Sequence, residues 1–175
     1  MKPFAVLALA ARSIATTALG VCLAAPAAEA QDRLGGHFGV LFPLVTHVNG
    51  DTVDIGDNFQ IGFPMGITVK TSDRYAFDLE FVPLLDPRET GPLNVSLTVH
   101  PGILRSFGNG WTGGLRMAFD INAASWGFTP LVNKGFPKGD VTYFIELVVP
   151  IRFQDDILGD THTSIGVGVH TGIGF

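Results

Sequence analysis

The last twelve residues, Ser164–Phe175, read SIGVGVHTGIGF and alternate small or polar residues with apolar ones. Apolar side chains recur at every second position except Thr171, and most of the residues between them are glycines. A two-residue period is typical of a β-strand, because successive side chains point to opposite faces of the sheet. The stretch therefore predicts a strand with one apolar face that continues to Phe175.

The same period runs through most of the chain before this strand. It predicts six further strands, at residues 37–48, 59–70, 75–83, 93–107, 111–122 and 141–153. Small bacterial barrels have an even number of strands, so a count of seven is incomplete. An eighth strand is expected within 124–139, where Trp126 and Phe128 begin a run of one parity. The alternative is a separate hairpin in residues 47–58, since Asn-Gly is a strong turn signal.

Short turns fix the expected pairing of these strands. In the first hairpin, a three-residue loop places Val69 opposite Phe77, and every apolar residue of the hairpin then meets an apolar one. In the second hairpin, a loop at residues 108–110 places Phe107 opposite Trp111. A slip of one residue would reverse the faces, so the pattern indicates these registers and an antiparallel arrangement.

Hairpins with one apolar face can form a soluble β-sandwich, a lipocalin-like cup or a membrane barrel. Here the polar face is mostly Gly, Ser, Thr, Asn and Ala, which makes a poor solvent face but suits a narrow lumen. Strands of about ten residues tilted by about 40° span roughly 25 Å, the height of an outer-membrane apolar band. The prediction is an all-β fold, a transmembrane antiparallel up-and-down β-barrel of about eight strands with its apolar face outside.

Aromatic and proline residues refine this picture. Tyr75, Phe107 and Trp111 lie on the apolar face beside the short turns, where a girdle at the membrane interface is expected. Prolines cannot donate to a β-ladder and normally mark edges or bulges. Local bulges or irregular pairing are therefore expected at the prolines within the strands, which are Pro43, Pro64, Pro83, Pro101 and Pro150.

The polar face of the predicted barrel carries nearly balanced charges. A salt-bridged filling of the lumen is the expected role of these groups, because unpaired buried charge is costly. The predicted network comprises Lys70, Asp78, Glu80, His100, Arg116, Asp120, Glu146 and Arg152, and His162 and His170 share the same face.

Catalytic and metal sites are less well supported by the spacing. Ser96 and His100 lie roughly 13 Å apart on one strand, so a hydrolase would need a histidine from another strand. His162 and His170 are roughly 26 Å apart along a strand and cannot bind one ion together. No catalytic residue, metal ligand or cofactor is predicted.

The first thirty residues predict export. A positive start is followed by an apolar stretch and by Ala28-Glu29-Ala30, which fits a signal-peptide cleavage site. Residues 1–30 are therefore expected to be a signal peptide and 31–175 a single barrel domain. The one cysteine, Cys22, lies inside this segment. Residues 31–175 carry a net charge of −6, which argues against a nucleic-acid-binding surface.

A final strand that alternates apolar and small residues and ends in Phe175 resembles the C-terminal signature of bacterial outer-membrane β-barrel proteins. The size is similar to that of the small OmpA/OmpX-type barrels. The resemblance implies an outer-membrane location in a Gram-negative cell, contact with membrane lipid, and a monomer. It also implies that Phe175 is part of the signal read by the barrel assembly machinery.

These observations lead to a functional expectation with two alternatives. We expect a non-enzymatic integral outer-membrane protein with a structural role or a role in passing small solutes. The first alternative is a soluble periplasmic lipocalin-like barrel that binds an apolar ligand inside. The second is an outer-membrane hydrolase that modifies lipid.

Overall fold

The computed structural model describes residues 33–87, 93–121, 123–155 and 161–175. The predicted signal peptide, residues 1–30, lies outside the described residues. No helix long and apolar enough to cross a membrane occurs in the described part of the chain. The strands are β1 (Leu34–Val48), β2 (Asp51–Asp54), β3 (Ile61–Gly62), β4 (Met65–Lys70), β5 (Tyr75–Asp86), β6 (Asn94–Gly108), β7 (Trp111–Asp120), β8 (Ser125–Lys138), β9 (Val141–Val148), β10 (Ile151–Asp155) and β11 (Thr161–Gly174).

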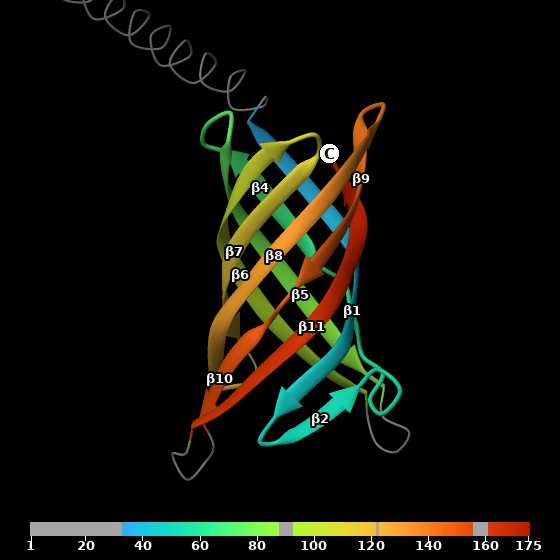
Figure 1. Ribbon diagram of the computed structural model, residues 1–175, viewed down its shortest axis with the longest axis vertical. Coiled ribbons are helices and arrows are strands. Elements are labelled where there is room, and N and C mark those ends of the chain that lie inside the picture. The colour runs from blue at the N-terminus through green and yellow to red at the C-terminus, as the bar shows by residue number, and fades with distance from the viewer. Residues whose placement is uncertain (1–32, 88–92, 122, 156–160) are drawn as a thin grey trace, which may run out of the picture. The chain divides into compact units, whose positions relative to one another are not determined.

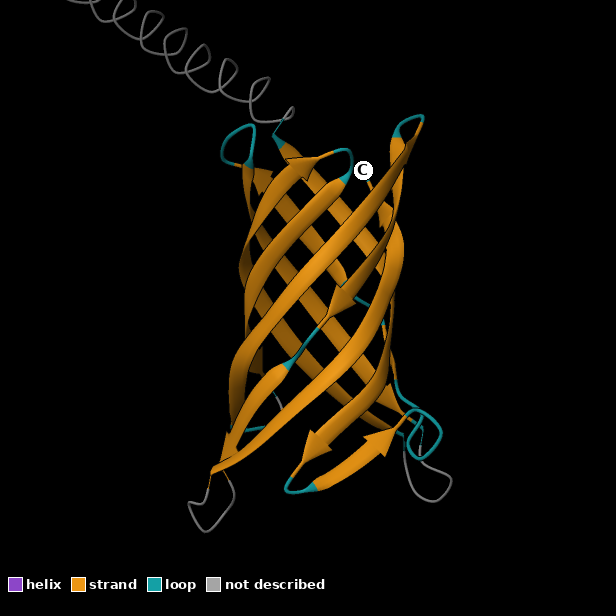
Figure 2. Ribbon diagram, viewed as in Figure 1, coloured by secondary structure: helices purple, strands orange, loops and turns teal. Residues whose placement is uncertain are grey.

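Eight wall strands close into a ring of antiparallel neighbours (Figures 1 and 2). β3 and β4 together form one wall strand between β1 and β5, and β9 and β10 form another between β8 and β11. β1 pairs with β11 and closes the ring. The predicted all-β antiparallel barrel of eight strands is therefore confirmed.

The closing seam joins the two ends of the barrel sequence. β1 and β11 pair from His37–Gly174 to Val48–Ser164. Beyond β11, Phe175 continues the ladder, because its N–H donates to the Gly36 carbonyl and its carbonyl accepts from the Gly36 N–H, both at 2.9 Å. The last strand, with its alternation of apolar and small residues, thus completes the wall of the barrel.

Both candidate locations for the missing strand are occupied. β8 supplies the eighth wall strand within the predicted range 124–139. The Asn-Gly segment also forms a hairpin, in which Asn49 and Gly50 have positive φ angles of 54° and 90°. Its second arm, β2, pairs with the end of β1 and extends the wall without joining the ring.

The predicted registers hold along both hairpins but fail at one turn. Val69 pairs with Phe77, as expected. At the second turn, Gly108 pairs with Trp111 and the register shifts after Ser106, so Phe107 is not the partner of Trp111. Gly108, Asn109 and Gly110 all have positive φ, which allows a tight turn with a bulge beside it.

Prolines disturb the wall in different ways. Pro64 separates β3 from β4, and Pro150 separates β9 from β10. The β1 register shifts between Pro43 and Val45, as predicted. Pro83 and Pro101 lie in regularly paired stretches between β5 and β6, without the bulge that was one of the two expectations. The irregular pairing that was the other expectation occurs at Pro101, where the β6–β7 ladder is interrupted. Their missing N–H groups are accommodated beside the β3–β4 break and in a gap in the β6–β7 ladder.

The barrel is apolar outside and polar inside. Large apolar side chains along the wall are exposed, among them Ile103 at 62%, Leu115 at 50% and Ile145 at 50%. Charged side chains of the opposite parity, such as Asp78 at 0% and Glu146 at 3%, are buried. The predicted assignment of faces is therefore correct, and the buried center of this fold is ionic.

Candidate functional site

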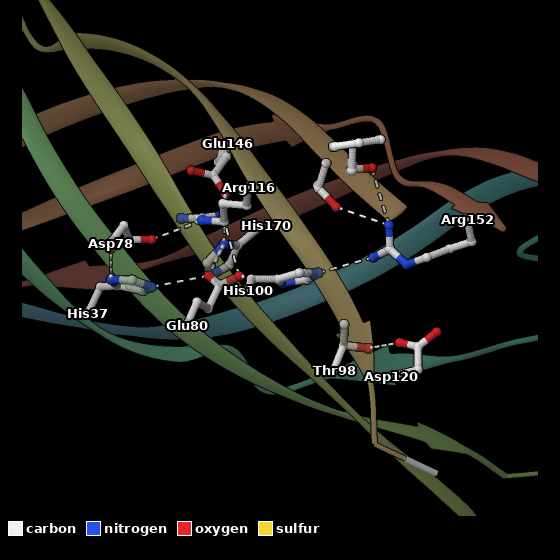
Figure 3. A network of polar contacts seen from close by, with 12 residues as sticks. His37, Asp78, Glu80, Thr98, His100, Arg116, Asp120, Glu146, Arg152 and His170 are labelled. Atoms are coloured by element: carbon white, nitrogen blue, oxygen red, sulfur yellow. Dashed lines mark hydrogen bonds and ion pairs between the residues drawn. The ribbon is translucent and has the colours of Figure 1, made fainter. Parts of the chain in front are cut away.

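Seven charged or titratable side chains meet in the middle of the lumen (Figure 3). They come from β1, β5, β6, β7, β9 and β11, each from a position whose parity points inward. We call this group the central network, and its members are His37, Asp78, Glu80, His100, Arg116, Glu146 and His170.

Arg116 is the hub of the central network. Its Nε donates to Asp78 at 2.9 Å, and its Nη1 donates to Glu146 at 2.8 Å and lies 3.4 Å from Glu80. All four side chains are at most 3% exposed. One buried guanidinium thus holds three carboxylates that project from two different strands, β5 and β9.

Histidines supply further contacts of two of these carboxylates, Glu80 and Glu146. His37 Nε2 and His100 Nδ1 each lie 3.1 Å from Glu80, and His170 Nδ1 lies 3.2 Å from Glu146. An ionised carboxylate can only accept, so each histidine donates there. Arg152 donates to the other ring nitrogen of His100 at 3.0 Å, which indicates a neutral His100 with its proton on Nδ1.

The other predicted lumen residues fall outside the central network. Arg152 contacts the Phe128 carbonyl and the Thr129 hydroxyl at 3.2 and 3.1 Å, in addition to His100. Asp120 accepts from Thr98 at 2.5 Å. Lys70 is exposed at the end of β4. His162 lies near the other end of the barrel, with Nδ1 3.0 Å from the Asn49 side chain.

Two cavities adjoin the central network. The larger, of about 410 Å³, is lined by Ser96, Asp120 and Arg152 and extends toward the longer connections. The smaller, of about 160 Å³, is lined by Thr68 and Thr112 and extends toward the short turns. Arg116, Glu146 and His170 line both. Their side chains therefore form a partition across the lumen.

The partition has limited potential for other chemistry. Ligand atoms of Glu80, Glu146 and His170 lie within 4.8 Å of one another, a spacing that could hold a metal ion. The Arg116 guanidinium already occupies the space between the two carboxylates and neutralises part of their charge. Ser96 lines the larger cavity, but both ring nitrogens of His100 are engaged by Glu80 and Arg152, so His100 is not free to act as its base.

Aromatic side chains gather on the outer wall at both ends. Tyr75, Phe107 and Trp111 lie beside the short turns, with exposures of 44%, 61% and 47%. The sequence prediction omitted Phe136 and Tyr143, which pair across β8 and β9 near the same end. At the other end, the rings of Trp126, Phe128 and Phe153 contact one another at centroid distances of 5.0 to 6.5 Å.

His37 is the network member that sequence reasoning missed. The strand that carries it is apolar on both faces, so its inward parity was hard to read. The pairing of β1 with β11 in the structure shows that His37 points inward. His37 lies opposite Gly174, and Gly39 lies opposite Gly172, which places His37 on the face that β11 turns inward.

The comparisons with known proteins found a distant structural similarity. No protein-family model matches the sequence, and the search of curated proteins found no match. Among solved structures, the chain is similar to the outer membrane protein OprG from Pseudomonas aeruginosa, with a TM-score of 0.44 and 9% sequence identity. The alignment covers 81% of this chain and 93% of that chain.

Proposed function

We propose that this protein is an integral outer-membrane β-barrel with a structural role and a closed lumen. The main support for the proposal is that the barrel is apolar outside and polar inside. Apolar side chains such as Ile103, Leu115 and Ile145 cover the wall, while the carboxylates and Arg116 lie within. A soluble protein rarely exposes so continuous an apolar surface.

The closed ring supports the same conclusion. Hydrocarbon offers no hydrogen-bond partners, so a sheet can span it only when its edges are paired. In this chain the β1–β11 ladder pairs the first and last wall strands. A lipocalin-like carrier would need the opposite arrangement, with an apolar interior for its ligand, and the buried ionic network does not favour that alternative.

A structural role follows from the partition. Arg116, Glu146 and His170 are 2–3% exposed even though a cavity adjoins them on each side. Tightly paired charges of this kind resist displacement, because breaking one pair leaves an uncompensated buried charge. We therefore infer a non-enzymatic barrel whose lumen is sealed at rest.

Export and assembly complete the proposal. Residues 1–30 would direct secretion, and the machinery that inserts barrels would recognise the last strand with Phe175. The mature chain would then stand as a monomer in a Gram-negative outer membrane, in contact with its lipids. Short turns face the periplasm in such barrels, so the Gly139-Asp140 turn would lie on the periplasmic side.

Fractionation tests the proposal directly. The protein expressed with its first thirty residues should stay in the membrane pellet after carbonate extraction. An unboiled sample should also migrate differently from a boiled one in a detergent gel, because a closed barrel resists unfolding by detergent. Recovery in the soluble periplasmic fraction would overturn the outer-membrane proposal in favour of a soluble barrel.

Passage of small solutes is a second candidate, supported by the cavities of about 410 and 160 Å³ on the two sides of the partition. Only the side chains between these cavities would have to move to join them. This role predicts measurable conductance through the unmodified protein, whereas the structural role predicts none.

A further inference from the structure

Two basic side chains stand on the outer wall at the short-turn end. Arg105 lies on β6 opposite Gly113 of β7, and Lys134 lies on β8 opposite Trp111. In the half of the wall nearest the short turns, the outward-facing charged side chains of the described residues are Arg105, Lys134 and Lys138, all basic. A charge on a lipid-facing wall is costly unless it reaches the interface, so these side chains are expected at the level of the lipid headgroups.

Aromatic rings hold both cations in place. The guanidinium carbon of Arg105 lies 5.8 Å from the Tyr75 ring centroid and 5.3 Å from that of Phe107. The ammonium of Lys134 lies 5.2 Å from the Trp111 centroid and 5.8 Å from that of Phe136. Cation–π contacts of this length orient a cation without neutralising its charge.

The cations have no acidic partner in the described part of the chain. Neither Arg105 nor Lys134 lies within 4.0 Å of a carboxylate among the described residues. Lys134 donates one hydrogen bond to the Asn109 carbonyl. An ammonium has three donors and a guanidinium five, so most of this donor capacity remains for an external anion.

One strand, β7, lies between the two cations. Gly113 of β7 pairs with Arg105 on one side and with Val132 on the other, whereas Lys134 pairs with Trp111. The Phe107 ring lies over Gly113, since a Cβ there would be 2.9 Å from that ring. Because neighbouring strands are about 4.8 Å apart, β6 and β8 hold the two basic residues roughly 10 Å apart across the sheet. Lys134 is also displaced by two residues along β8, since Val132 is the residue in line with Arg105. The surface between the cations is thus formed by the rings of Phe107 and Trp111, with Arg105 at one edge and Lys134 at the other.

We propose that this surface binds the headgroup of an anionic phospholipid, with its phosphate between Arg105 and Lys134. The inference rests on the proposed membrane location. Guanidinium and ammonium groups are favourable partners for phosphate, and aromatic rings suit the headgroup level. Two unneutralised cations favour a headgroup of net negative charge, such as phosphatidylglycerol, over a zwitterionic one.

The distribution of charge indicates which leaflet supplies the lipid. The end with the longer connections exposes Asp51, Asp54, Asp57 and Asp155. Such a surface repels anionic headgroups. At the short-turn end the exposed acids Asp73 and Asp140 lie in the turns, beside the basic Arg74 and Lys138. The site therefore belongs to the leaflet at the short turns, which in outer-membrane barrels face the periplasm.

The two tryptophans of the chain provide matched reporters. Trp111 forms part of the site, and Trp126 lies on the outer wall at the opposite end. A Trp126→Phe variant and a Trp111→Phe variant would be folded into phosphatidylcholine vesicles that contain either brominated phosphatidylglycerol or brominated phosphatidylcholine. Bromine quenches a nearby indole, so the extent of quenching reports the local lipid composition.

We expect phosphatidylglycerol to be enriched about fivefold or more at Trp111, in proportion to the attraction of one or two cations for an anionic headgroup. Trp126 should show no enrichment. Arg105→Gln/Lys134→Gln should abolish the enrichment at Trp111. Lys70→Gln/Arg74→Gln removes the same charge from this end but not from the outer wall, so it should leave the enrichment intact.

Two failures are distinguishable. Quenching of Trp111 to the same extent by both lipids would place the barrel in the bilayer and overturn the headgroup site. Absence of quenching of either tryptophan by either lipid would show that the wall does not contact lipid, which overturns both the site and the proposed membrane location.

Discussion

Arginine substitutions at Leu115 and Ile121 test whether the wall faces lipid. Both point outward, at exposures of 50% and 62%, but Leu115 lies midway along β7 and Ile121 just beyond its end. Arg at the bilayer midplane costs about 2–4 kcal/mol and near the interface about 0–1 kcal/mol. Leu115→Arg should therefore lower the free energy of unfolding in vesicles by about 2–4 kcal/mol, and Ile121→Arg by much less.

The measurement is a urea titration of protein folded into phosphatidylcholine vesicles, followed by tryptophan fluorescence. Small and equal losses for Leu115→Arg and Ile121→Arg would contradict a lipid-facing wall, since an exposed Arg on a water-facing sheet is nearly neutral.

Strand parity accounts for how far individual site residues could be predicted. Asp78, Glu80, Arg116 and Glu146 lie on strands whose faces differ clearly in polarity, and their inward positions follow from the sequence. Their actual contacts depend on which strands neighbour one another and how far each is displaced along the axis. Lys70 has the inward parity but is exposed at the end of β4, because parity does not determine height in the barrel.

At the scale of strands, the seam between β1 and β11 depends on glycine. A Cβ on Gly172 would clash with the Phe38 carbonyl oxygen and lie 2.7 Å from the Gly39 Cα, whereas one on Gly174 would come no closer than 3.6 Å to the Gly36 carbonyl oxygen. Gly172→Ala should therefore destabilise the barrel by about 1–3 kcal/mol, the usual cost of overpacking.

Gly174→Ala is the matched control, because it adds the same methyl group to the same face of β11. Urea unfolding and the fraction of heat-modifiable protein after refolding would measure both effects. Equal stabilities of the two variants would show that the seam is looser than the pairing indicates.

Most strands could be predicted because alternation is strong wherever one face is apolar. β1 is apolar on both faces, so its alternation is the weakest of the predicted strands. β2 could be recognised only from the Asn-Gly turn that precedes it. The bulge at Gly108 could not be predicted, because Phe107 fits opposite Trp111 on parity alone and the shift arises from positive φ at three successive residues. The prolines show the same limit, since their effect depends on which neighbouring strand would have accepted the missing N–H.

At the scale of the whole molecule, the partition determines whether solutes can pass through the lumen. Arg116 and Glu146 line both cavities, whereas Asp120 and Arg152 line only the larger of the two. The central network and the cavities thus offer two charge-balanced pairs, one within the partition and one beside it.

The structural role predicts that the wild-type protein shows no conductance above background in a planar bilayer. Arg116→Ser/Glu146→Ser deletes one positive and one negative side chain from the partition and should open a path. Asp78 and Glu80 of the central network remain beside that path, so the current should favour cations. Asp120→Ser/Arg152→Ser makes the same change in charge away from the partition and should stay closed. Heat-modifiable migration of each variant would show that it is folded, and steady conductance through the wild type would replace the structural role with solute passage.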